Sequence, residues 1–332
     1  MATLSSPNMF RMPYSSHYEL SSNYEPFLSY QKRSLLPLQW RRKRTFLPFR
    51  LCVAQAGDSS STSSTRGQQT QSFLSFLCPL LKLIGGTDPS APRNELLERT
   101  TSGISTLARL PWGSKVSPEI AELSKTRTTF RPLQLYEFEA CPFCRRVREA
   151  LTELDLSAEI YPCPKGSIHH RSIVQEKGGK EQFPFLVDAN TGVNLYESGE
   201  IVKYLFRTYG DGRNPSPGIL ESTIFTGWVP TLMRAGRGMT RWHFAVTEIP
   251  SKKLELFSYE NNQFARIVRE ALCELELPYI LHNAGIGSGS LPQQVQVPSL
   301  VDPNTGMRLE NHEEICDYLF SRYRSKESKA DS

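Results

Sequence analysis

The feature that most constrains the fold is an internal duplication. Residues 135–156, LYEFEACPFCRRVREALTELDL, align with residues 256–277, LFSYENNQFARIVREALCELEL. Residues 183–206, FPFLVDANTGVNLYESGEIVKYLF, align in the same way with residues 297–320, VPSLVDPNTGMRLENHEEICDYLF. A weaker echo precedes each copy, ISTLARLPWG before the first and VPTLMRAGRG before the second. Similarity over such a length predicts two copies of one structural unit.

Each copy predicts the same order of elements, taken here from the first. Residues 133–138 are rich in β-forming side chains and predict a strand, and apolar residues recur at helical spacing after Pro142. The stretch AEIYPC predicts a second strand, and the variable polar stretch after it can form a helix. PFLVD and VNLYE around an Asn–Thr–Gly turn predict a hairpin, and SGEIVKYLFRTYG predicts a helix from an N-cap at Ser198 to a stop at Gly210. We therefore expect an α/β fold with a mixed four-stranded sheet in each copy.

This order and the changes in composition define the expected domain boundaries. They are a transit peptide at 1–56, a low-complexity linker at 57–72, an N-terminal helical extension at 73–130, a first domain with CPFC at 131–212, a connector at 213–252, a second domain without that cysteine pair at 253–325, and a tail at 326–332.

The basic charge of the chain is concentrated in residues 1–56. They hold eight Lys/Arg and two acidic residues, so they account for the formal net charge of +5, and the rest of the chain is close to neutral. The folded part therefore shows no charge bias toward nucleic acid. A segment rich in Ser, Arg and Pro is typical of an organelle transit peptide, and its excess of Ser favours the chloroplast over the mitochondrion. We expect cleavage near Val53–Ala54; a basic tail without a targeting role is the alternative.

The apolar segment FLSFLCPLLKLI, residues 73–84, is too short to span a bilayer and contains Pro79 and Lys82. We expect it to form a short helix packed on a domain. The alternative is a helix that lies on a membrane surface and gives the protein peripheral membrane contact.

Two of the seven cysteines, Cys141 and Cys144, form a CxxC pair at the predicted junction of a strand and a helix. A thiolate is the nucleophile in disulfide exchange, and a helix N-terminus together with nearby arginines lowers a thiol pKa from its ordinary value of about 8.5. The spacing therefore predicts Cys141 as a nucleophile and Cys144 as the thiol that resolves a mixed disulfide. Arg145 and Arg146 add positive charge near this site.

Metal binding is the alternative to redox chemistry for these cysteines. A zinc site would combine the pair with Cys163 and His169 or His170, and an iron–sulfur cluster would bridge two chains. We expect no metal, because Pro142 opening an amphipathic helix suits a redox pair better. Cys163 is expected to be a buried core thiol. We expect His169, His170 and the basic loop 234–243 to be solvated surface.

The motifs CPFC, FPFLVD and LYESGEIVKYL, in this order and spacing, resemble those of glutaredoxins. They are still more similar to the N-terminal, glutathione-binding domain of glutathione S-transferases. The whole chain resembles plant chloroplast proteins with two tandem domains of this thioredoxin-like fold.

The resemblance implies a role for each matching residue. Cys141 is the nucleophile and Cys144 the resolving thiol. A cis Pro184 faces the dithiol, and the Phe183 backbone pairs with glutathione. The remaining expected glutathione contacts are Glu197 and Ser198, which hold the γ-glutamyl end, and Arg145.

The second copy lacks these groups. Asn262 replaces Cys141, Ala265 replaces Cys144, and Asn311–His312 replaces Glu197–Ser198. Asn262 suits a helix N-cap. The apolar pattern is kept, so we expect a structural or partner-binding module.

The expected function is that of a glutaredoxin-like, glutathione-linked thiol–disulfide oxidoreductase of the chloroplast, acting on protein disulfides or mixed disulfides. A non-catalytic chloroplast scaffold with thioredoxin-like binding modules is the first alternative. A glutathione-dependent transferase or isomerase is the second. Ordinary transferase activity is disfavoured, because transferases carry a helical domain where this chain has its second copy.

Overall fold

The computed structural model describes residues 88–91, 94–126, 131–291 and 295–325, all within one structural unit, residues 61–332. The predicted transit peptide at 1–56, the linker at 57–72, the apolar segment 73–84 and the tail 326–332 lie outside the described residues. Across the described helices, none combines the length and apolar character needed to cross a membrane.

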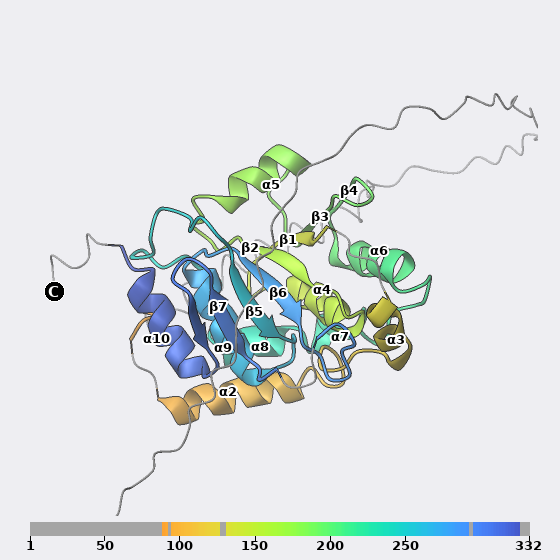
Figure 1. Cartoon of the computed structure of the whole chain (residues 1–332), viewed down its shortest axis with the longest axis horizontal. Coiled ribbons are helices and arrows are strands. Elements are labelled where there is room, and N and C mark those ends of the chain that lie inside the picture. The colour runs from red at the N-terminus through yellow and green to blue at the C-terminus, as the bar shows by residue number, and fades with distance from the viewer. Residues whose placement is uncertain (1–87, 92–93, 127–130, 292–294, 326–332) are drawn as a thin grey trace, which may run out of the picture. The chain divides into compact units, whose positions relative to one another are not determined.

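One eight-stranded mixed sheet organises the described chain, in the order β4-β3-β1-β2-β6-β5-β7-β8 (Figure 1). We call residues 131–212 the first half and residues 253–325 the second half. The strands of the first half are β1 (Leu133–Glu137), β2 (Ala158–Pro162), β3 (Phe185–Asp188) and β4 (Val193–Leu195). Those of the second half are β5 (Leu254–Ser258), β6 (Tyr279–Asn283), β7 (Ser299–Asp302) and β8 (Met307–Leu309).

The two halves share this sheet, whereas the sequence predicts a separate four-stranded sheet in each. The seam is the antiparallel pairing of β2 with β6, in which Ile160 lies opposite Tyr279 and Ala158 opposite Leu281. In each half the strand at the seam also pairs in parallel with its neighbour, β1 or β5. An edge strand presents unpaired N–H and C=O groups, and joining two such edges satisfies both rows.

The helices follow the same order in both halves. The first half has α4 (Pro142–Glu153), α5 (His170–Gly178) and α6 (Ser198–Tyr209); the second has α9 (Gln263–Glu274) and α10 (His312–Arg322). The described residues between β6 and β7 form no helix equivalent to α5. Among the described residues, four further helices lie outside the halves, namely α2 (Glu95–Leu107), α3 (Pro118–Thr126), α7 (Ser222–Phe225) and α8 (Trp228–Met233).

A continuous apolar core crosses the seam on one face of the sheet. Alternate residues of β1 and β5, such as Leu135 and Leu256, point into it because successive strand side chains face opposite ways. Apolar residues of α4, α6, α9 and α10 close this core. On the other face of the first half, Tyr136 and Phe185 pack with Val174 of α5 in a second cluster, which also contains Cys141 and Cys144.

Local signals explain the helix starts, with one correction. The predicted cap Asn262 is confirmed, because its side chain accepts from the backbone N–H groups of Phe264 and Ala265. The predicted cap Ser198 is wrong. Glu197 holds the N-cap position of α6 with φ of 64° and no side-chain cap bond, so Ser198 is the first helical residue.

Each echo segment, together with the helix that leads into it, contacts the opposite half. Ser102 of α2, just before the first echo segment, donates to the carbonyl oxygen of Gln263 in the second half (2.6 Å), and the Asn261 side chain of that half donates to the carbonyl oxygen of Thr106 (3.1 Å). Thr231 of α8 donates to the carbonyl oxygen of Ala140 in the first half (2.5 Å). Residues 213–252, expected to be a connector, therefore contain helices that pack on the first half.

Residues expected to be solvated are buried along these contacts. Arg234 pairs with Glu270 (2.7 Å), Arg237 with Glu274 (2.6 Å), and Arg241 with Glu276 (2.9 Å). His170 is buried and its Nδ1 lies 2.7 Å from the carbonyl oxygen of Pro162. The prediction of solvated surface was wrong for His170 and for the three arginines of the basic loop, whose glutamate partners lie far away in the sequence. His169 is half-buried, and His243 at the end of the loop is exposed, as predicted. Cys163 is buried, as predicted.

Candidate functional site

The cysteine pair lies where β1 ends and α4 begins. Cys141 is the N-cap residue of α4 and Pro142 is the first helical residue. The backbone N–H of Cys144 donates to the Cys141 sulfur at 3.3 Å. Both are free cysteines and buried, with Cys141 2% and Cys144 0% exposed. A sulfur therefore occupies the position that a capping oxygen takes in other helices.

The two thiols differ in acidity. Burial raises the pKa of Cys141, but hydrogen bonds from the Cys144 thiol and from the backbone N–H groups of Cys144 and Phe143 outweigh it, so this pKa is lowered. Burial and the hydrogen bond to Cys141 raise the pKa of Cys144 well above its ordinary value. The geometry thus favours a thiolate at Cys141 and a neutral thiol at Cys144.

Apolar and aromatic side chains enclose the pair. The cluster that contains both cysteines also includes Phe138, Phe183 and Met239. The Phe138 and Phe183 rings meet edge to face at 6.1 Å, and the Phe183–Pro184 peptide bond is cis. A site lined in this way excludes water and strengthens the electrostatic effect of each nearby donor.

The start of α6 presents hydrogen-bond donors without a side-chain cap. Glu197 is exposed, and the Gln182 side-chain amide donates to its carboxylate, which brings the Phe183–Pro184 turn beside it. Ser198 is buried, and its hydroxyl accepts from Arg146 at 3.2 Å. Backbone N–H groups at an uncapped helix N-terminus favour an anion such as a carboxylate.

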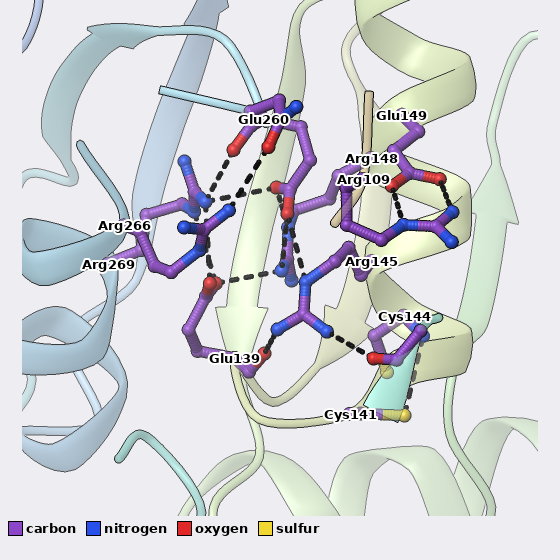
Figure 2. Close-up of polar contacts among 12 residues, drawn as sticks. Arg109, Glu139, Cys141, Cys144, Arg145, Arg148, Glu149, Glu260, Arg266 and Arg269 are labelled. Atoms are coloured by element: carbon purple, nitrogen blue, oxygen red, sulfur yellow. Dashed lines mark hydrogen bonds and ion pairs between the residues drawn. The ribbon is translucent and has the colours of Figure 1, made fainter. Parts of the chain in front are cut away.

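Arg145 lies away from this surface, although the resemblance implies that it contacts glutathione. Its guanidinium is buried and donates to the carbonyl oxygens of Gly227 (2.9 Å) and Glu139 (3.3 Å). It also forms an ion pair with Glu260 of the second half (3.4 Å). Figure 2 shows Arg145 between Glu260 and the cysteine pair. Its contacts are thus internal to the protein.

Arg145 belongs to a group of buried charges that the sequence did not lead us to expect. We call this group the central ion-pair network; its members are Arg145, Arg148, Arg269, Glu137, Glu139 and Glu260. The sequence did carry one signal for it, since Arg148 and Arg269 occupy matching positions in the two aligned segments and recur with the apolar residues around them.

The equivalent helix starts in the second half are closed by asparagine. The Asn262 side chain accepts from Phe264 N (3.0 Å) and Ala265 N (2.9 Å) at α9. The Asn311 side chain accepts from Glu313 N (2.8 Å) and Glu314 N (3.4 Å) at α10. At the equivalent positions of the first half, the backbone N–H groups face the Cys141 sulfur or have no side-chain cap. In the second half, asparagine side chains accept these hydrogen bonds.

No group of three or more His, Cys, Asp or Glu side chains in the described part of the chain is placed to hold a metal ion. Cys163 donates instead to the Tyr161 carbonyl oxygen at 3.4 Å.

The first half is therefore a mixed α/β domain with a CxxC pair at the start of its first helix, which is the arrangement of a thioredoxin-like domain. Residues 135–216 match the family model "Glutathione S-transferase, N-terminal domain". No curated protein and no solved structure matched the chain. The chain thus contains a thioredoxin-like domain of the glutathione-transferase N-terminal type, which is consistent with glutathione binding.

Proposed function

We propose that the protein is a glutathione-linked thiol–disulfide oxidoreductase of the glutaredoxin type, with Cys141 as its nucleophile. The observation that carries this proposal is the Cys141 sulfur at the N-cap of α4, accepting the Cys144 N–H at 3.3 Å. These donors stabilise a thiolate, and a thiolate is the species that attacks a disulfide.

The reaction balances with glutathione as the reductant. The Cys141 thiolate attacks the glutathione sulfur of a protein mixed disulfide, and the protein sulfur leaves as a thiolate that takes a proton from solvent. A second glutathione thiolate then attacks the Cys141 mixed disulfide, which releases glutathione disulfide and restores the Cys141 thiolate. Alternatively, Cys144 loses its proton and attacks Cys141, which forms an internal disulfide and releases glutathione.

Glutathione binding is assigned to the surface beside the pair. The backbone of Phe183, which precedes Pro184, would pair with the glutathione peptide. The uncapped first turn of α6, where Ser198 is the first residue, would receive the γ-glutamyl carboxylate, and the exposed Glu197 would receive the ammonium group. No side chain caps α6, whereas Asn311 caps the equivalent helix α10, and this difference supports the assignment.

The proposal extends to origin and location. The two halves are tandem thioredoxin-like domains in which the second has lost its chemistry; the shared order of elements supports this view. The N-terminal segment 1–56 directs the protein to the chloroplast and is removed near Val53–Ala54, as its composition indicates.

The test is turnover of a glutathionylated peptide by the full chain, with glutathione as reductant. We expect Cys141→Ser to abolish turnover and Cys144→Ser to retain it, because the second glutathione can replace Cys144. A rate that Cys141→Ser leaves unchanged would refute the proposal.

A second candidate function is binding of a partner protein, without catalysis. Nine of the fourteen exposed large apolar side chains in the described residues lie within 96–110 and 224–233, on and beside α2, α7 and α8. Because the halves share a sheet, deleting residues 253–324 would unfold the first half rather than test binding. Phe225→Glu and Leu107→Glu are the better test: a binding role predicts loss of function in the plant with turnover intact.

A transferase or isomerase role gains less support. In the described part of the chain, a groove of about 580 Å³ lies beside Tyr161 and Lys253, and a pocket of about 320 Å³ lies beside His312 and Cys316. Neither is lined by Cys141, so neither places an apolar substrate at the nucleophile.

A further inference from the structure

The second half reaches into the active site of the first through buried ion pairs. Glu260 lies just before α9, and its carboxylate accepts from Arg148 Nε at 2.6 Å. The same carboxylate lies 3.4 Å from Arg145 Nε and 3.1 Å from an Arg269 terminal nitrogen. Glu260 and both α4 arginines are at most 2% exposed. This carboxylate therefore binds two side chains of the helix that Cys141 begins.

Those arginines hold the loop that leads into Cys141. Arg145 donates to the Glu139 carbonyl oxygen (3.3 Å), and Arg148 pairs with the Glu139 carboxylate (2.8 Å). The next carbonyl oxygen, that of Ala140, accepts from Thr231 (2.5 Å). Glu139 and Ala140, the two residues before Cys141, are thus held by side chains that lie outside the β1–α4 turn.

The network joins three arginines to three glutamates. Burial raises the pKa of Glu260, but Arg148 and Arg269 outweigh it and lower this pKa to about 2. Glu260 therefore remains a carboxylate at neutral pH. Removing a single partner would leave an uncompensated charge in the interior.

We propose that Glu260 of the second half is a positioning residue, which fixes Cys141 at the start of α4 through Arg145 and Arg148 (Figure 2). The half without the CxxC pair thereby completes the site of the half that has it. This proposal rests on the assignment of Cys141 as the nucleophile.

A charge effect and a positioning effect predict opposite results for Glu260→Gln. Removing a negative charge would, through space alone, favour the Cys141 thiolate and lower its pKa. Releasing the loop would turn the sulfur away from the N–H donors of Cys144 and Phe143, and the pKa would rise toward that of an ordinary thiol. The sign of the change, taken together with that in a variant that keeps the Glu260 charge, therefore separates the two roles.

The readout is the pH midpoint of Cys141 alkylation by iodoacetamide in the full chain, with the modified peptide identified by mass. We expect Glu260→Gln to raise this midpoint by about one pH unit, which is about a tenfold slower reaction below the midpoint. The titratable groups that act on Cys141 are Cys144 and Arg146 of α4 and Glu137 of β1. Burial raises the pKa of Glu137 to about 7 and the Glu260 charge adds to that rise, so Glu260→Gln would ionise Glu137 further and oppose the direct charge effect on Cys141. Arg145→Lys keeps the Glu260 charge and therefore separates this indirect effect from positioning. A midpoint that is unchanged or lower in the folded variant would overturn the proposal.

Two further variants keep the test decisive. Arg145→Lys retains the charge but loses the planar fork that joins Glu260 to the loop, so it should raise the midpoint even if Glu260→Gln fails to fold. Glu270→Gln is the matched control, because Glu270 is equally buried and pairs with Arg234 at 2.7 Å. We expect the control to lower the melting temperature without moving the midpoint; an equal shift would mean general loosening and would also overturn the proposal.

The outcome is separable from that of the proposed function. Alkylation needs neither glutathione nor turnover. If the alkylation midpoint is low in the wild type and unchanged in Glu260→Gln and Arg145→Lys, the positioning role is rejected and the oxidoreductase proposal is unaffected. If the midpoint rises in both variants but the wild-type chain shows no turnover, the positioning role is supported and the oxidoreductase proposal is rejected.

Discussion

One residue at the start of one helix separates the two halves chemically. Cys141 and Asn262 both hold the N-cap of the first helix in their half, and both accept backbone N–H donors. The asparagine oxygen satisfies two donors. The sulfur accepts one at 3.3 Å and is the nucleophile in the proposed function. The same local geometry thus provides either stability or reactivity.

The lowered Cys141 pKa makes a pH prediction at this scale. Alkylation follows the thiolate fraction, so its midpoint should lie below the ordinary thiol value of about 8.5 and the rate should fall as pH drops through that midpoint. Cys144→Ala should raise the midpoint, because the thiol hydrogen bond to Cys141 is lost. The check is the iodoacetamide rate against pH, native and in urea. A native midpoint equal to that in urea would contradict the pKa assignment.

Asn262 makes a stability prediction. Asn262→Ala should lower the free energy of unfolding by about 1 kcal/mol, because two N–H groups of α9 lose their cap. Urea denaturation measures this loss. Asn311→Ala at α10 is a matched control and should cost a similar amount. No loss in either variant would show that water caps these helices equally well.

At the scale of elements, buried ion pairs fasten the helices to one another. Arg109, just after α2, binds Glu149 of α4 through two bonds of 2.8 and 2.6 Å. Arg234, just after α8, binds Glu270 of α9 in the same manner, with bonds of 2.8 and 2.7 Å. In each case an arginine of the echo segment binds the first helix of the half that follows that segment in the sequence. The helix that leads into the segment, α2 or α8, contacts the other half.

Arg109→Met tests this fastening. It leaves the Glu149 carboxylate buried without its partner and should lower the free energy of unfolding by about 3–5 kcal/mol. The double variant Arg109→Met, Glu149→Leu removes both charges and should recover most of that loss. Urea denaturation of the three proteins gives the comparison. A double variant as unstable as the single one would show that packing, and not the orphan charge, dominates.

At the scale of the molecule, the shared sheet makes the two halves one structure. The β2–β6 pairing, the continuous core and the central ion-pair network all cross the seam. Separating the halves would expose a strand edge and leave Glu260 and Arg269 without Arg148 and Glu139. The second half therefore depends on the first for its fold, and in the proposal made above the first depends on the second for its site.

This dependence predicts a single unfolding transition. Far-ultraviolet circular dichroism and tryptophan fluorescence should give the same urea midpoint, because no part of the sheet can unfold while the rest stays intact. Residues 253–325 produced alone should show no cooperative transition. Two separate transitions for the full chain would refute the structural unity of the halves.

The sequence alone determined the local part of this protein. Periodicity and turn residues predicted the strands and helices of both copies, and the CPFC motif at a strand–helix junction located the cysteine pair, because such signals depend on residues close in the chain. The Ser198 cap failed for a local reason, since Glu197 takes a positive φ that the pattern does not reveal.

How the two copies combine depends on long-range contacts that the sequence pattern does not reveal. The joining of β2 to β6, the crossing of α2 and α8 onto opposite halves, and the burial of Arg145, Arg234 and Glu260 each depend on partners far apart in the sequence. A charged side chain has the same letter whether it is solvated or paired in the interior, and only the position of its partner distinguishes the two. The proposed roles of Arg145 in the network and of Glu260 beside the nucleophile therefore came from the fold.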